Sequence, residues 1–331
     1  MTRTTAPTPN QAGRWIIPRF GPPSVLEWQT WSSLPTPGQA EALVRIMVAG
    51  EVIALGDDAH SKGLKIGDRV ASMCMIGAHA THIVSPVADL LKLESTDDAI
   101  KICALPLNYM TACGMLNRSE AKLSPGSSIL IGSAAGGVGT AIAQLVDAFD
   151  MNIHMIGTCS ISKFDYVKSL GITPVDRHDP DLANTVRALT TEGAGVNVAY
   201  DAVGSPASLL RSHKALKAET GRLVCIGVMG HIAEDGNGML SDLSADQLLA
   251  QTFERMSYWG VEREYYRETR DLWVKDFCKI VEKVREGKLD PVISKLWKLE
   301  DAVQANQMLV DGKGVMGKML YVVDGEFSEK S

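Results

Sequence analysis

The sequence predicts an α/β protein in which a helix-covered parallel sheet follows a β-rich N-terminal region. From about residue 104 onward, short buried strands such as residues 128–132 alternate with helices. This alternation is typical of a parallel sheet with helices on both faces. The residues before it instead carry strand patterns at 42–48 (ALVRIMV) and 81–84, and a GDRV turn at 67–70 leads into another strand.

The pattern of apolar residues places the elements of the second region. The helix that follows residue 136 has one apolar face, formed by Val138, Ala141, Ile142, Leu145, Val146 and Phe149. A further helix is expected at 162–170, and a solvated, mixed-charge helical face at 262–270 (EREYYRETR). The expected strands after the first are residues 153–158, 197–200, 223–227 and 319–323.

The length of 331 residues is enough for two domains with separate cores. The change of pattern near residue 104 and the return to short strands near residue 290 divide the chain. One domain is expected to combine 1–104 with 290–331, and the other to span 105–289. Within the first, residues 1–13 are expected to be a flexible tail, because Pro7 and Pro9 prevent a helix there.

Charge and composition exclude several classes of function. The chain has 33 basic and 39 acidic side chains, a net charge of −6, and no dense basic stretch that would follow a nucleic acid backbone. No apolar run is long enough for a membrane span, and the N-terminus lacks the apolar segment of a signal peptide. The 6 cysteines form no Cys-x-x-Cys pair, which argues against structural zinc and disulfides. We therefore expect a cytoplasmic protein without a metal.

The segment SAAGGVG, residues 133–139, lies between a predicted strand and a predicted helix. In that context glycines let the backbone approach a pyrophosphate, which the helix N-terminus attracts. The alternative is a tight strand-to-helix turn without a ligand. The residues expected to bind the dinucleotide here are Ser133, Ala134, Ala135, Gly136, Gly137, Val138 and Gly139.

The end of the next strand indicates which dinucleotide binds. NAD sites usually place an acid about 20 residues after the glycines, to hold the ribose hydroxyls. This chain has no acid at 157–160 (GTCS); instead Ser160 and Lys163 follow, spaced to hold a 2′-phosphate, and Arg177 is a further candidate cation. NADPH is therefore favoured over NADH, with a solvated Lys163 as the alternative.

Several motifs in the same order resemble one known family, the zinc-free quinone oxidoreductase and enoyl reductase branch of the medium-chain dehydrogenase/reductase superfamily. The resemblance spans nearly the whole chain. The motifs are residues 21–26 (GPPSVL), 67–70 (GDRV), 105–112 (LPLNYMTA), 133–139 (SAAGGVG), 200–204 (YDAVG), 287–289 (GKL) and 317–318 (GK).

The resemblance implies a GroES-like domain, here shortened, and a Rossmann domain that binds NADPH. It also implies hydride transfer to the β-carbon of an enone, quinone or enoyl thioester, and a homodimer. Thr111 is expected near the nicotinamide, Asn108 is expected to bind the cofactor from the segment that faces the cleft, and Lys318 is expected to reach the cofactor from the C-terminal segment. The residues expected to line the nicotinamide face are Val203, Gly204, Gly227, Val228 and Met229.

The chain departs from this family after residue 50. Relatives carry an "A-x-G-x-N" element, a helix and a "PG-x-E-x-x-G" segment there, roughly two dozen residues that this chain lacks. That stretch normally supplies an Asn or Tyr beside the nicotinamide. The remaining candidates for a proton donor are Tyr109, His79 and Tyr258, although the tyrosines could simply be packing residues and His79 a rim residue.

Three functions are compatible with these features. The first is an NADPH-dependent reductase of a conjugated carbonyl, with room for a bulky small-molecule substrate. The second is a non-redox catalyst of natural-product biosynthesis, such as an isomerase, dehydratase or cyclase, that reuses the same cleft. The third is a protein that binds NADPH without catalysis. The first is preferred, because the residues expected to hold the hydride donor are all present.

Overall fold

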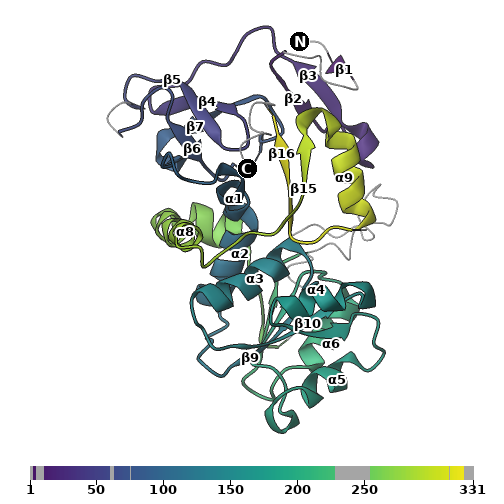
Figure 1. Cartoon of the computed structure of the whole chain (residues 1–331). Helices are drawn as coiled ribbons and strands as arrows, with labels where there is room; N and C mark the ends of the chain where they lie inside the picture. The colour runs from purple at the N-terminus through teal and green to yellow at the C-terminus, as the bar shows by residue number, and fades with distance from the viewer. Residues whose placement is uncertain are drawn as a thin grey trace. The chain divides into compact units, whose positions relative to one another are not determined.

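The computed structural model describes residues 3–4, 11–59, 63–74, 76–227, 254–312 and 314–323 (Figure 1). The contacts divide the chain into two compact units. Unit 1 consists of Met1–Pro106 and Ile293–Ser331, and unit 2 of Leu107–Val292. These borders lie within three residues of the expected domain boundaries at 104 and 290.

Unit 2 is built on a parallel sheet of six strands in the order β11-β10-β9-β12-β13-β14. Every neighbouring pair in this sheet is parallel. The order reverses beside β9, as in doubly wound dinucleotide-binding folds, so the predicted Rossmann-type fold is confirmed. The strands are β9 (Ser128–Ile131), β10 (His154–Cys159), β11 (Thr173–Asp176), β12 (Val198–Asp201), β13 (Arg222–Cys225) and β14 (Met256–Tyr258).

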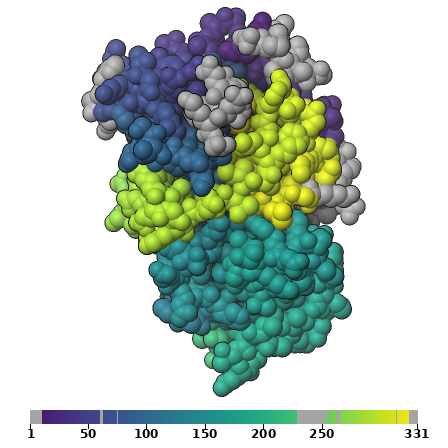
Figure 2. All heavy atoms as spheres, in the orientation of Figure 1, coloured from purple at the N-terminus to yellow at the C-terminus, as the bar shows by residue number. Residues whose placement is uncertain are grey.

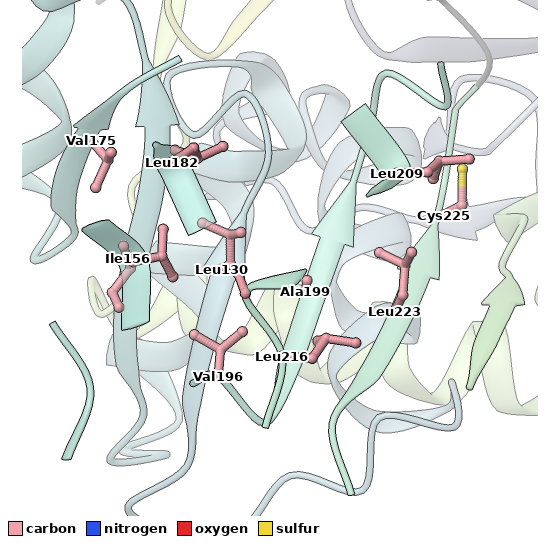
Figure 3. Close-up of a cluster of buried hydrophobic side chains, with 12 residues drawn as sticks. Leu130, Ile156, Val175, Leu182, Val196, Ala199, Leu209, Leu216, Leu223 and Cys225 are labelled. Carbon is pink, nitrogen blue, oxygen red and sulfur yellow. The ribbon is translucent and has the colours of Figure 1, made fainter. Parts of the chain in front are cut away.

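Two helices, α5 (Leu182–Ala188) and α6 (Pro206–Lys214), cover one face of the sheet. Figure 3 shows their leucines against the strands, with Leu182 near Leu130 of β9 and Leu209 beside Cys225 of β13. Each of these side chains is at most 5% exposed. The cluster excludes water between helix and sheet, which is the main source of stability for such a layer.

The opposite face is covered by α2 (Leu105–Asn117) and α3 (Gly137–Ala148). The Tyr200 hydroxyl, on the side of β12 away from the cluster of Figure 3, donates to the carbonyl oxygen of Met115 at 3.1 Å. Gly114 makes room on α2 for an indole, because a Cβ there would lie 2.1 Å from Cζ2 of Trp259. Two further helices are α4 (Phe164–Ser169) and α8 (Arg270–Arg285).

The expected solvated face at 262–270 is wrong in part. Residues Val261–Arg267 form a π-helix, and Tyr265 and Tyr266 are buried. The Tyr265 hydroxyl donates to the Asp276 carboxylate at 2.5 Å, and Arg118 Nη2 donates to the same oxygen at 2.5 Å. The tyrosine rings are buried because their surface is large and mostly apolar. The charged residues beside them in the sequence made the whole segment resemble a solvated helix.

Unit 1 contains a five-stranded antiparallel sheet in the order β7-β4-β5-β6-β8. Its strands are β4 (Glu41–Ile46), β5 (Gly50–Leu55), β6 (Arg69–Ala71), β7 (His82–Pro86) and β8 (Leu91–Lys92). The helix α1 (Ala99–Cys103) follows. Three residues join β4 directly to β5, and the two strands pair in register from Ile46↔Gly50. The point after residue 50, where the resemblance implies a missing segment, lies inside β5, and the missing segment stays a prediction.

The C-terminal return completes unit 1. Strands β15 (Ile293–Lys298) and β16 (Lys318–Val322) pair in parallel, and α9 (Ala302–Asp311) lies between them in sequence. In Figure 2 this yellow segment packs against the purple and blue N-terminal residues. The Trp15 indole donates to the carbonyl oxygen of Leu299 at 2.8 Å, so the two ends of the chain share one core.

The N-terminal residues differ from the expected flexible tail where they are described. A second sheet of unit 1 has the order β1-β3-β2, formed by β1 (Arg3–Thr4), β2 (Gly13–Ile16) and β3 (Glu27–Thr30). Gly13 pairs with Thr30 inside this sheet. Backbone hydrogen bonds between strands therefore fix residues that we expected, from Pro7 and Pro9, to form a flexible tail.

The carboxylate of Asp276 is a test of how unit 2 is held together. Burial alone would raise its pKa, but hydrogen bonds from Tyr265, Arg118 and Lys279 outweigh burial and hold the pKa below its usual range. A depressed carboxyl pKa adds stability above the unfolded pKa of about 3.9 and loses it as the pH falls. Asp276→Asn should therefore lower the free energy of unfolding by about 3 kcal/mol at pH 7 and flatten the acid side of the stability curve.

Urea denaturation between pH 3 and 7 measures both effects. Glu286→Gln is the matched control, since this exposed carboxylate pairs with Lys283 and Lys288 on the surface and should leave the midpoint unchanged. An Asp276→Asn protein with the wild-type midpoint and acid limb would contradict the role of this carboxylate.

Candidate functional site

The glycine-rich turn begins where β9 ends, and β10 fixes its path. The Ala134 amide donates to the carbonyl oxygen of Thr158 at 2.9 Å, and the Ser133 amide donates to the Thr158 hydroxyl at 3.2 Å. Ser133 has a φ of 57°, in the left-handed region. At Gly139 a Cβ would lie 2.5 Å from the carbonyl oxygen of Ala134, so only glycine lets α3 approach the turn this closely.

The first turn of α3 presents free backbone donors. Gly136 is the N-cap and has no side chain to satisfy the amides of the first turn. Gly136, Gly137 and Val138 are partly exposed, so these amides are accessible to a ligand. A helix N-terminus of this kind carries a partial positive charge that favours an anion. The turn has the geometry that pyrophosphate binding requires.

A pocket of about 450 Å³ opens beside this turn, at the carboxyl ends of β9, β10 and β12. The sequence-predicted residues that line it are Ser133, Ala135, Gly136, Ser160, Lys163, Arg177 and Val203. Lining residues that the sequence analysis missed include Thr158, Cys159, His178, Asp201, Ser208, Arg211 and Ser212. Ala134, Gly137, Val138, Gly139 and Gly204 do not line this pocket, and the side chain of Ala134 is fully buried.

The end of β10 has the polar character that the sequence predicts. Thr158, Cys159 and Ser160 line the pocket without an acidic side chain, and Lys163 follows in the next turn. Arg177 comes from the end of β11, where its amide donates to the carbonyl oxygen of Cys159 at 3.0 Å. Burial raises the pKa of the Cys159 thiol, against the lowering effect of the Lys163 and Arg177 charges. Residues from two strands thus bring cations to one wall.

Asp201, at the end of β12, is the one carboxylate among the described residues that line this pocket. Its Oδ1 accepts from the amides of Val203 and Gly204 at 2.9 Å each and from the Ser208 hydroxyl at 3.2 Å. Its Oδ2 accepts from the Ser212 hydroxyl at 2.8 Å. The "YD-x-VG" motif therefore shapes the loop and anchors α6, and the carboxylate has little capacity left for a ligand.

Several other predicted cofactor residues lie elsewhere in their units. Asn108 and Thr111 are partly exposed on α2. Gly227 follows β13, and a Cβ there would lie 2.3 Å from the carbonyl oxygen of Ala202. Val228 and Met229 fall outside the described residues. Lys318 begins β16 in unit 1 and is partly buried.

Two of the three predicted proton donors are packing residues in this structure. Tyr109 is 2% exposed, and its hydroxyl donates to Gln144 Oε1 at 2.5 Å. Burial raises the Tyr109 pKa far above its usual range. Tyr258 is half-buried against the apolar cluster of Figure 3, and burial raises its pKa, with a further contribution from Cys225. Both hydroxyls are poor proton donors because their anions would be desolvated.

His79 lies in a polar group of unit 1. Its ring meets the ring of Tyr321 edge to face, with centroids 4.8 Å apart. Burial lowers the pKa of His79, and the nearby Lys318 ammonium lowers it further. Burial also lowers the pKa of Lys318. Lys318 and Tyr321 both come from β16. Val323, directly after this strand, donates its amide to the carbonyl oxygen of Met47 at the β4–β5 hairpin tip.

The family of the chain follows from its relatives. A quinone oxidoreductase-like protein 2 homolog of Nematostella vectensis is 30% identical over 283 residues, which cover 82% of this chain and 71% of the relative. The chain belongs to the medium-chain dehydrogenase/reductase family. Within this family of oxidoreductases, its relatives are those of the zinc-independent, quinone oxidoreductase-like branch.

Other similarities agree with this membership. A family model described as "Zinc-binding dehydrogenase" matches residues 137–275. A synaptic vesicle membrane protein VAT-1 homolog-like protein of Mus musculus is 28% identical over 300 residues, covering 83% of this chain and 66% of the relative, just under two thirds. A quinone oxidoreductase structure from Pseudomonas syringae has a TM-score of 0.75 at 25% identity, covering 94% of this chain and all of the other.

Two further observations concern metal ligands and long apolar helices. Among the described residues, no group of three or more His, Cys, Asp and Glu side chains is arranged to hold a metal ion. No helix in the described part of the chain is long and apolar enough to cross a bilayer.

The close contact at Gly139 makes a prediction about the turn. Gly139→Ala should lower the free energy of unfolding by about 1–3 kcal/mol, because the added methyl must push α3 away from the backbone of Ala134. Gly136→Ala is the matched comparison, since its Cβ would meet one atom, the Ser133 carbonyl oxygen, at 3.1 Å and its φ is −80°. Thermal and urea denaturation measure the difference. Equal midpoints for the two variants would show that the turn can relax.

Proposed function

We propose that this protein binds NADPH in the pocket of unit 2 and reduces a conjugated carbonyl compound, such as an enone, quinone or enoyl thioester. The observation that carries the proposal is the pocket itself: a glycine turn and a helix N-terminus adjoin a wall of serine, lysine and arginine with no free carboxylate. Family membership supports the same reaction class.

The residues present fit an adenosine phosphate. The backbone amides of the first turn of α3 are placed to hold a pyrophosphate, and no side chain caps them. Ser160 and Lys163 line the pocket at the end of β10, where an acid would hold an unphosphorylated ribose. A 2′-phosphate carries about 1.5 to 2 negative charges at neutral pH, so cations there favour NADPH over NADH.

Bound NADPH would supply the hydride, and the protein has to stabilise the charge that develops on the substrate oxygen. Of the three predicted donors, His79 is the one that remains, because Tyr109 and Tyr258 are committed to packing. Its lowered pKa keeps the imidazole neutral at pH 7. A neutral imidazole can donate a hydrogen bond to an enolate oxygen, and the neighbouring Lys318 charge adds to the stabilisation.

The part of unit 1 around the β4–β5 hairpin is the reason to propose His79 as the donor to the substrate oxygen. The resemblance implies that relatives carry an Asn or Tyr in a segment after residue 50 that this chain lacks. The hairpin tip at Met47 is hydrogen-bonded to Val323, two residues beyond Tyr321, whose ring contacts His79. A polar group of unit 1 therefore lies next to the point where the usual donor is lost.

An assay with NADPH and a panel of enones, quinones and enoyl thioesters tests the reaction. Lys163→Ala should weaken NADPH binding about 10-fold or more and leave NADH binding nearly unchanged, because it removes one charge-assisted hydrogen bond to phosphate. Lys168→Ala, one turn further along α4 and away from the pocket, is the control. Calorimetry measures both nucleotides. Equal weakening of NADPH and NADH would disprove the phosphate assignment.

The same assay separates the two other candidate functions. Steady NADPH oxidation coupled to loss of the conjugated chromophore supports the reductase. Turnover of a substrate without net NADPH consumption would indicate a non-redox catalyst, which the missing donor segment favours as the second candidate. Binding of NADPH without turnover of any compound would indicate a binding protein. The homodimer and the cytoplasmic location stay predictions.

His79 makes a separate prediction for the reductase. His79→Ala should lower kcat about 100-fold or more with little change in the Kd of NADPH, since a general acid or hydrogen-bond donor acts on the substrate. His82→Ala is the matched control, because His82 is on β7 and its Nδ1 lies 3.0 Å from the Thr81 hydroxyl. Stopped-flow measurement of NADPH oxidation gives the rate. A His79→Ala enzyme with the wild-type kcat would assign the donor elsewhere.

A further inference from the structure

The second wall of the pocket comes from α6, and it presents a cation that the sequence motifs do not indicate. Ser208, Arg211 and Ser212 all line the pocket, and their spacing of three and four residues places them on neighbouring turns of one helix face. The two serines are buried and donate to Asp201. These bonds fix α6 against the end of β12 and hold Arg211 at the pocket.

Arg211 reaches across to the opposite wall. Its Nη1 donates to the carbonyl oxygen of Arg177 at 3.3 Å, although the two residues are 34 positions apart in the chain. Arg177 in turn donates from Nε to Nε2 of His178 at 3.0 Å. This bond orients the guanidinium plane and uses only Nε, so the two terminal amino groups of Arg177 are left for another acceptor.

The described residues that line the pocket include more basic than acidic side chains. Lys163, Arg177 and Arg211 contribute three permanent cations to the lining, against one carboxylate. That carboxylate, Asp201, already accepts four hydrogen bonds from the loop and from α6. Two arginines that line the same pocket favour a phosphate, whose oxygens match the planar fork of a guanidinium group.

We propose that Arg211 is a specificity-determining residue of the dinucleotide site and forms, with Arg177, a two-arginine clamp on the phosphate carried by the adenosine ribose. The inference rests on the proposed function and extends it. The first wall, from β10 and β11, selects the phosphate through Lys163 and Arg177, and the second wall, from α6, closes on it through Arg211.

Fragments of the cofactor test the clamp without the nicotinamide or the substrate. Calorimetry gives the Kd of AMP and the Kd of adenosine 2′,5′-bisphosphate. The first divided by the second measures how much the ribose 2′-phosphate strengthens binding. Arg211→Ala should reduce this ratio about 10-fold, because one charge-assisted contact corresponds to at least 1.4 kcal/mol, and should leave the Kd of AMP within about 2-fold. The ratio for Arg211→Lys, which keeps the charge but loses the planar fork, should lie between the wild-type and Arg211→Ala ratios.

Lys214→Ala is the matched control, since it removes a positive charge from the end of the same helix outside the pocket. It should leave the ratio unchanged. A purely structural role of Arg211 would instead weaken both fragments together and lower the melting temperature, and this result would overturn the clamp. An unchanged ratio in both Arg211 variants would overturn it as well.

Adenosine 3′,5′-bisphosphate, the regioisomer found in coenzyme A, distinguishes the two sources of a ribose phosphate. Tighter binding of the 3′-isomer by the wild-type protein would overturn the assignment to a 2′-phosphate. Failure of the proposed function gives a different result: the wild-type protein would then bind neither AMP nor the bisphosphates. A wild-type preference for the 2′-isomer that survives in Arg211→Ala would reject the clamp alone.

Discussion

The close approach of α3 to the turn after β9 is the constraint on which the candidate site depends. Gly139 allows this approach because its Cβ would otherwise lie 2.5 Å from the backbone of Ala134. The same turn is bonded to Thr158 of β10, so the position of the helix N-terminus and the end of the second strand are set together. An anion at the helix N-terminus and a phosphate at the end of β10 then have a defined separation.

A hydrogen-bonded junction at Asp201 supports the other side of the pocket. Asp201 joins the loop after β12 to α6 through four hydrogen bonds, and it is buried. A buried carboxylate is tolerated only where such donors replace water. Because the donors are two amides and two hydroxyls, the junction adds no positive charge of its own. No hydrogen bond from an arginine of the pocket is therefore needed to satisfy Asp201, and the guanidinium groups of Arg177 and Arg211 can bind an anionic ligand.

The sheet of unit 1 is closed at one point by the short connection between β4 and β5. The β4–β5 hairpin keeps the antiparallel pairing through a register shift between Leu43 and Val44, and the Cys103 thiol donates to the carbonyl oxygen of Val48 at 2.9 Å. The carbonyl oxygen of Val48, in the connection between β4 and β5, thus has a hydrogen-bond partner. The polar group around His79 and Lys318 lies near this hairpin, since Val323, just after β16, is hydrogen-bonded to Met47.

Local sequence determined the strands and helices of the parallel sheet, the glycine turn and the absence of an acid at the end of β10. These features depend on periodicity and on short-range backbone geometry, which a single stretch of chain encodes. Only the tertiary structure decided that Arg211 meets Arg177, that Asp201 is spent on α6, and that Tyr109 is buried. Those outcomes depend on which strand ends meet at one edge of the sheet, and on which helix face the sheet covers. Strand order is set by packing between segments far apart in sequence, so the spacing of residues along the chain does not contain it.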